Sequence, residues 1–177
     1  MTMEDLSYPI GKFNPLPELT ADKRIATIDE ITAAPAALRA AVRGLTDKQL
    51  DTPYRPGGWT VRQVAHHLPD SHMNAYMRFR LALTEDEPVI KPYQQQLWAE
   101  LPDAKSGDID MSLMLFEGLH QRWVELLHSM SPADFKRTFR HPESGVQSLE
   151  RTLQMYGWHG EHHVAHITSL RRRMGWE

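Results

Sequence analysis

The chain has 177 residues, no cysteine and a formal net charge of -3 at pH 7. This length fits one domain with a core of its own, and we expect a single domain over 1–177 with an extended N-terminal arm at about 1–19. The lack of cysteine excludes disulfides, thiolate metal ligands and a cysteine nucleophile. Charges are mixed without a basic stripe, so nucleic-acid binding is not expected. No segment reaches the ~20 apolar residues of a membrane span or resembles a signal peptide, which favours a cytoplasmic protein.

Helical periodicity dominates the chain and predicts four long helices. They cover about residues 20–43, 60–84, 109–130 and 148–174. Pro35 is expected to bend or split the first helix, and Thr60 with Gln63 matches the capping-box spacing at the start of the second. No alternation of apolar and polar residues is long enough to build a sheet. Because a long connection at 85–108 separates the second and third helices, we predict an all-α antiparallel four-helix bundle with one long crossover.

Four of the ten histidines lie within nine residues of the fourth helix, in the segment WHGEHHVAH at 158–166. Histidines four residues apart project from one face of a helix, and two such pairs are present. On this helix, His163 lies close to the centre of the apolar stripe and His159 lies near its edge. In the other pair, His162 with His166, His162 points toward the polar side. His159 and His163 are therefore predicted to face the interior and to bind one metal ion.

A two-histidine site needs another ligand from a neighbouring helix. His67 flanks the apolar stripe of the second helix, and His72 lies near the centre of that stripe. His120 lies on the inner face of the third helix, between Phe116 and Trp123. A single inward histidine is more often a hydrogen-bonded core residue than a ligand. Periodicity does not rank these three histidines, so the third ligand stays open on this argument.

The chain resembles the YfiT-type branch of the DinB superfamily over nearly its whole length. The resemblance is carried by LSYPIGKF (6–13), LDTPYRPGGWTVRQVAHHLPDS (50–71), HQRW (120–123), WHGEHHVAHI (158–167) and RRMGW (172–176). It implies a four-helix-bundle metalloprotein, commonly a homodimer, with one ligand from the HH pair of the second helix and two from HxxxH in the fourth. By motif position these ligands are His67, His159 and His163.

The resemblance also implies a function. The branch is described as metal-dependent hydrolases, and the wider superfamily includes S-transferases that use low-molecular-weight thiols such as bacillithiol. One divalent ion per chain, held by three neutral imidazoles, keeps one coordination position free. Water or a thiol that binds there is activated by the ion. Zinc suits nitrogen ligands, and nickel also binds imidazole. We expect a metal-dependent hydrolase acting on a small molecule, with a thiol S-transferase or a non-catalytic metal- or ligand-binding bundle as alternatives.

Other roles at the site have several candidates. Those for proton transfer, or for orienting the metal ligands, are His72, His120, His166, Asp70 and Glu161. Glu161 points away from the apolar stripe of its helix. Tyr93 and Trp98, from the long connection, are predicted to line the mouth of the pocket. Gly157 and Gly160 lie on the inner face of the fourth helix, where they leave room for a ligand or for a close helix.

Overall fold

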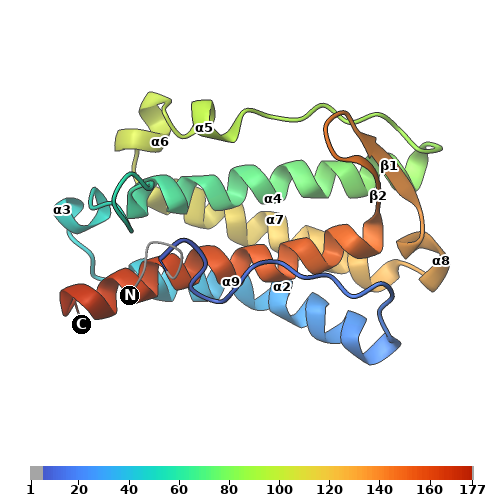
Figure 1. The fold of residues 1–177 in the computed structure, drawn as a ribbon, viewed down its shortest axis with the longest axis horizontal. Coiled ribbons are helices and arrows are strands. Elements are labelled where there is room, and N and C mark those ends of the chain that lie inside the picture. The colour runs from blue at the N-terminus through green and yellow to red at the C-terminus, as the bar shows by residue number, and fades with distance from the viewer. Residues whose placement is uncertain (1–5, 177) are drawn as a thin grey trace.

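The computed structural model describes residues 6–176, most of which form a bundle of four long helices (Figure 1). These helices are α2 (Ala21–Val42), α4 (Val61–Thr84), α7 (Ile109–Ser129) and α9 (Leu149–Met174). The predicted all-α four-helix bundle is confirmed, and each long helix lies within a residue of its predicted bounds. Residues 1–5 of the predicted arm lie outside the described part of the chain.

Hydrogen bonds between segments far apart in sequence show the relative directions of the four long helices. Leu19 donates its backbone N–H to Glu150, so α2 and α9 begin at the same end of the bundle. Arg62 donates to the carbonyl of Gly107, so α4 and α7 begin together at the other end. The adjacent pairs α2–α9 and α4–α7 are therefore parallel, and the predicted antiparallel arrangement holds only for α2–α7 and α4–α9 (Figure 1). The long crossover makes this possible, because it returns the chain from the end of α4 to the start of α7.

The connections contain short elements of their own. The described residues include α3 (Asp47–Leu50), α5 (Gln95–Trp98), α6 (Pro102–Ser106), α8 (Pro132–Phe135), β1 (Thr138–His141) and β2 (Gly145–Ser148). The two strands pair as an antiparallel hairpin, and the backbone N–H of Ile90 in the crossover donates to Arg140 of β1. The expectation of no sheet was wrong for this segment, since strands of four residues are too short for an alternating pattern to show.

A proline lies inside two of the long helices, Pro35 in α2 and Pro69 in α4. Neither divides its helix, so the alternative of a split first helix was wrong. Proline has no backbone N–H, and the carbonyl four residues earlier loses its helical donor. In α2 that carbonyl belongs to Ile31, and in α4 it belongs to Ala65. Both oxygens are thereby available to donors outside their own helices.

The apolar core consists of two clusters with histidines between them. One cluster includes Phe79, Trp123 and Leu153, and the other includes Leu68, Phe116 and Ile167. His72 lies at their boundary, with its ring 4.9 Å from that of Phe116 and 6.0 Å from that of Trp123. A polar layer thus crosses the middle of the bundle.

The N-terminal arm lies along α9 (Figure 1). The indole of Trp158 donates to the carbonyl of Gly11, and the backbone N–H of Leu16 donates to the side chain of Gln154. The arm therefore covers one side of α9 near its histidines. No helix within residues 6–176 combines the length and apolar composition needed to cross a membrane.

Candidate metal centre

Three histidine side chains from α4 and α9 converge in the polar layer of the bundle. His67, His159 and His163 each offer one ring nitrogen, and these three atoms lie within 4.8 Å of one another. The Nε2 atoms of His67 and His159 are 3.3 Å apart. Two nitrogens bound to one ion in a tetrahedral arrangement at about 2.1 Å lie about 3.4 Å apart, so this pair has the spacing that an ion needs. We call these residues the histidine triad.

Burial keeps the triad in the protonation state that binds metals. Desolvation lowers the pKa of His67 from 6.5 to about 3. Desolvation, and then the neighbouring histidines, also lower the pKa values of His159 and His163 well below the usual value. A neutral imidazole has a lone pair for a metal, which an imidazolium lacks. The buried Nδ1 of His163 also has no hydrogen-bond partner among residues 6–176. The triad therefore fits a divalent ion held by nitrogen alone.

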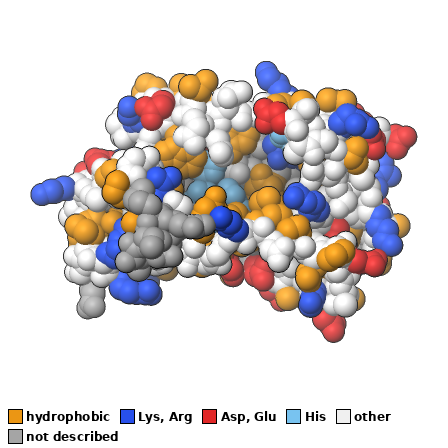
Figure 2. Space-filling model, in the orientation of Figure 1, with side chains coloured by type: hydrophobic (Ala, Val, Ile, Leu, Met, Phe, Trp, Pro, Cys, Tyr) orange, Lys and Arg blue, Asp and Glu red, His pale blue; other side chains and the backbone are white. Residues whose placement is uncertain are grey.

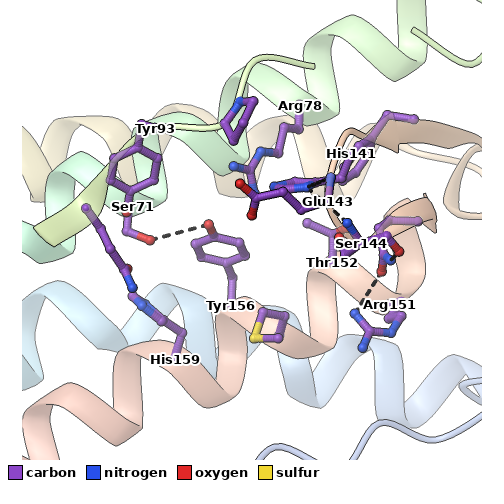
Figure 3. Close-up of a pocket in the computed structure, with 15 residues that line it drawn as sticks. Ser71, Arg78, Tyr93, His141, Glu143, Ser144, Arg151, Thr152, Tyr156 and His159 are labelled. Atoms are coloured by element: carbon purple, nitrogen blue, oxygen red, sulfur yellow. Dashed lines mark hydrogen bonds between the residues drawn. The ribbon is translucent and has the colours of Figure 1, made fainter. Parts of the chain in front are cut away.

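A cavity of about 300 Å³ opens beside the triad, between α4, α9, the crossover and the hairpin (Figure 3). His159, Tyr156, Ser71 and Tyr93 line the end near the triad. The hydroxyls of Ser71 and Tyr156 are 3.3 Å apart. Figure 3 places charged side chains at the other end, among them Arg78, Glu143 and Arg151. The cavity thus joins the triad to a polar mouth and is large enough for a small molecule.

A second cavity, of about 290 Å³, reaches the triad from another side. Its lining includes Trp59, Gln96, His159 and His163. The ring of Trp59 lies 4.6 Å from that of His67, and its indole N–H donates to Gln96. Figure 2 shows histidine side chains at the bottom of a hollow in the molecular surface. The centre is therefore accessible from outside, with Trp59 covering His67.

Comparisons with known proteins agree with this geometry. The family model for the DinB superfamily matches residues 30–167. The chain belongs to the DinB superfamily. A relative from Bacillus mycoides, named "putative metal-dependent hydrolase", is 55% identical over 174 residues, which are 98% of this chain and 100% of the relative. A Bacillus cereus relative of the same name is 54% identical over 174 residues, again 98% of this chain and all of the relative.

Solved structures support the same assignment. YfiT from Bacillus subtilis, described as "a probable metal-dependent hydrolase with an unusual four-helix bundle topology", has a TM-score of 0.95 and 50% identity to this chain. The match covers 98% of this chain and 99% of YfiT. TT2238, described as a four-helix bundle protein, has a TM-score of 0.59 and 20% identity, covering 82% of this chain and 98% of TT2238. The second likeness supports the fold alone, and the first confirms the YfiT-type resemblance.

In this DinB chain, the other two histidines that periodicity left open lie behind the triad. Nε2 of His72 is 3.1 Å from Nδ1 of His159, and Nε2 of His120 is 2.9 Å from Nδ1 of His72. Both side chains are buried, and desolvation lowers the pKa of His120 to about 4. His72 and His120 therefore contact the site through His159 and stand apart from the cluster of candidate ligand atoms.

The remaining candidates for proton transfer make no hydrogen bond to the triad among the described residues, although the ring of His166 lies 5.4 Å from that of His163. His166 has its Nε2 3.1 Å from the carbonyl of Ser7, and its ring stacks on Tyr54 at 3.9 Å. Asp70 is half-buried, and desolvation, with a smaller effect of Asp103, raises its pKa to about 6. Glu161 is exposed, as its direction on the helix predicts. Among the described residues, no hydrogen bond joins Asp70 or Glu161 to the triad.

Two expectations about neighbouring side chains need correction. His162 was predicted to point toward the polar surface, but it is 7% exposed, because Trp158 stacks on its ring at 4.3 Å and Tyr8 of the arm lies over it. Tyr93 lines the first cavity as expected. Trp98 instead packs against Tyr93, with ring centroids 4.8 Å apart, and is absent from the lining of that cavity.

The glycines of α9 serve close helix packing. A Cβ added at Gly157 would lie 2.8 Å from Cγ2 of Thr27, and one added at Gly160 would lie 3.1 Å from Cβ of Ala34. Both contacts are with α2. Of the two expectations for these glycines, the structure supports a close helix, which brings α2 against the histidine face of α9.

Proposed function

We propose that this chain is a metal-dependent hydrolase in which the histidine triad holds one divalent ion. The observation that carries the proposal is the convergence of three neutral ring nitrogens, from the buried His67 and His163 and the half-buried His159, beside a cavity of about 300 Å³. The names of the Bacillus mycoides relative and of YfiT point in the same direction. Zinc is the proposed ion because the ligands are nitrogens only, and nickel is the alternative.

Each residue at the centre has a distinct part in this chemistry. A divalent ion with three imidazole ligands supplies a Lewis acid with a free coordination position. Trp59 shields His67 from water on one side. On the cavity side, the hydroxyls of Ser71 and Tyr156 are placed to hydrogen-bond to polar atoms of a substrate. Burial raises the pKa of Tyr93, so its hydroxyl stays protonated and can donate a hydrogen bond to a substrate.

A thiol S-transferase is the second candidate, because two cavities meet at the triad. His159 lines both of them, so two reactants could approach the centre from different sides. A transferase needs this access for a low-molecular-weight thiol and an electrophile, whereas hydrolysis needs it for one substrate and water. The same protein preparation can test both reactions.

The test measures metal content and turnover together. Purified protein loaded with zinc or nickel is incubated with ester and amide panels, and separately with bacillithiol or another cellular thiol plus electrophiles. Hydrolysis without thiol supports the proposal, and turnover only with thiol supports the transferase. His159→Ala and His163→Ala should lose both metal and activity. The control is His128→Ala, since His128 is exposed on α7. Full metal occupancy without any turnover would favour the non-catalytic bundle.

The assembly expected from the family resemblance is a homodimer, and this stays a prediction. Sedimentation velocity at micromolar concentration tests it directly. A single species of about 41 kDa, twice the 20.4 kDa of the chain, is the expected result. A monomer at all concentrations would contradict it.

A further inference from the structure

A row of histidines crosses the bundle from α2 to the triad. Nδ1 of His120 lies 2.6 Å from the carbonyl oxygen of Ile31 in α2. Nε2 of His120 lies 2.9 Å from Nδ1 of His72, and Nε2 of His72 lies 3.1 Å from Nδ1 of His159. The row therefore links one residue from each of the four long helices, and it ends on the back of a triad residue.

The first acceptor in the row, the carbonyl of Ile31, lacks a helical donor because of a proline. Residue 35 would normally donate its backbone N–H to the carbonyl of Ile31, but Pro35 has no N–H. A buried carbonyl without a partner costs free energy, so this oxygen needs a donor from elsewhere. His120 of α7 is the donor that the structure provides. The anchor of the row is thus encoded in the sequence of α2.

The carbonyl fixes the direction of every hydrogen bond in the row. A carbonyl oxygen only accepts, so Nδ1 of His120 carries the proton. Nε2 of a neutral His120 then has the lone pair and accepts from Nδ1 of His72. By the same rule, Nε2 of His72 accepts from Nδ1 of His159. His159 therefore keeps its proton on Nδ1, and its lone pair lies on Nε2, the atom that is 3.3 Å from Nε2 of His67.

The opposite direction is unfavourable at the buried end of the row. It would place a lone pair of His120 against the lone pairs of the Ile31 carbonyl, with 2.6 Å between the atoms. His72 is 0% exposed and His120 is 2% exposed, so water has little access to relieve that repulsion. Burial without a carboxylate in the row also favours neutral rings, each with one N–H and one lone pair.

We infer that His72 and His120, anchored on the carbonyl of Ile31, are positioning residues that fix the tautomer of His159 and direct its Nε2 lone pair to the metal centre. The inference rests on the proposed metal site and explains why the Nε2 lone pair of His159 is available to a metal before the metal binds. A metal-bound histidine usually donates its other N–H to a carboxylate, a carbonyl or water. Here two imidazoles carry that role to a backbone carbonyl on the far side of the bundle.

The first test reads the tautomers directly in metal-free protein. Long-range ¹H–¹⁵N NMR of ¹⁵N-histidine-labelled chain at neutral pH distinguishes Nδ1–H from Nε2–H rings, and single substitutions assign the signals. We expect His72, His120 and His159 all in the Nδ1–H form. An Nε2–H form of His72 or His120 would overturn the inference, whatever the enzyme activity. The predicted tautomers in a protein that hydrolyses nothing would instead overturn only the proposed function.

The second test measures metal affinity by competition with a chelator. His72→Leu removes the acceptor of the His159 N–H, and we expect zinc binding to weaken by about 10–100-fold. His72→Gln is the matched variant, because an amide can accept from His159 and donate to His120. It should regain most of the affinity. Wild-type affinity in His72→Leu, or equal losses in both variants, would reduce His72 to a packing residue.

The anchor has its own test, far from the metal. Pro35→Ala adds a backbone N–H that competes for the carbonyl of Ile31, so the hydrogen bond from His120 should weaken and its Nδ1 proton signal should move upfield. Thr32→Ala is the control, since the hydroxyl of Thr32 bonds to the carbonyl of Ile28 in the same turn. An unchanged proton signal in Pro35→Ala would contradict the anchoring step.

Discussion

The two histidine pairs of α9 have the same spacing and differ in what surrounds them. His159 and His163 face α4, where His67 brings a third ring nitrogen within 4.8 Å. His162 and His166 are also buried, but the N-terminal arm and aromatic rings cover them. Burial therefore does not distinguish a candidate ligand pair from a packed pair in this helix.

The distinguishing features lie on other helices. The inner pair, His159 with His163, lies beside a third imidazole, that of His67, and Nδ1 of His159 has a hydrogen-bond partner in His72. The outer pair, His162 with His166, contacts the N-terminal arm, where Nε2 of His166 lies 3.1 Å from the carbonyl oxygen of Ser7. A metal site thus needs converging lone pairs and partners that hold them, whereas a packed histidine needs only a covered ring.

The largest effect should come from removing a ring of the inner pair. His163→Ala takes away one of three proposed ligands, and we expect metal affinity to fall by more than the roughly 10–100-fold that is typical of residues behind a ligand. His166→Ala, in the outer pair, should keep one bound ion per chain. Inductively coupled plasma mass spectrometry after dialysis compares the two variants. Equal metal retention in both would remove the distinction between the pairs.

A second effect, on stability instead of metal binding, is expected from acid on the metal-free protein. Desolvation holds the pKa of His120 at about 4 and those of His162 and His166 also at about 4, against 6.5 when unperturbed. Between these values the unfolded chain binds more protons, so stability is full above pH 6.5 and falls as the pH drops toward 4. His120 alone should lower the free energy of unfolding by roughly 3 kcal/mol over this range.

Urea unfolding at pH 7, 5.5 and 4.5 measures this loss. His120→Leu should reduce the pH dependence without abolishing it, because His162 and His166 remain and only the imidazole at position 120 is lost. His128→Ala is the matched histidine substitution at an exposed position of α7. A wild-type free energy of unfolding that stays constant from pH 7 to 4.5 would show that these rings are not held neutral by burial.

The smallest effect concerns the helix contact that supports the inner pair. Gly157→Ala would place a methyl group 2.8 Å from Cγ2 of Thr27, and overpacking should outweigh the gain in helix propensity by roughly 1 kcal/mol. Gly118→Ala, in open space on α7, should instead stabilise the protein by about 0.5–1 kcal/mol. Thermal unfolding compares the two. Stabilisation by Gly157→Ala would mean that α2 and α9 are not tightly packed there.

Much of the bundle is predictable from local signals, and the site is predictable only in part. Apolar periodicity and caps such as Thr60 with Gln63 place the four helices because these signals act within a few residues. Periodicity also finds the inner pair. Periodicity does not separate His67 from His72, because it shows only which face of a helix a residue is on. It does not show which of the two rings on α4 lies at the same height along the bundle as the inner pair of α9. The family motif made that choice.

Other features depend on contacts that a helical pattern does not contain. His162 looked exposed because part of its cover is Tyr8 of the arm, at the opposite end of the chain, in addition to Trp158 one turn earlier in the same helix. The hairpin was missed because its strands have four residues each. One signal for the histidine row was present in the sequence: Pro35 marks the carbonyl of Ile31 as free, although only the fold shows that His120 reaches it.

The most direct measurement is anomalous diffraction at the metal absorption edge from crystals of zinc- or nickel-loaded protein. We expect one strong peak per chain, at about 2.0–2.1 Å from Nε2 of His67, from Nε2 of His159 and from one ring nitrogen of His163. His72 and His120 should lie behind His159 without contacting the peak. A peak at His162 and His166, or no ordered peak at full metal loading, would show that the histidine triad is not the metal site.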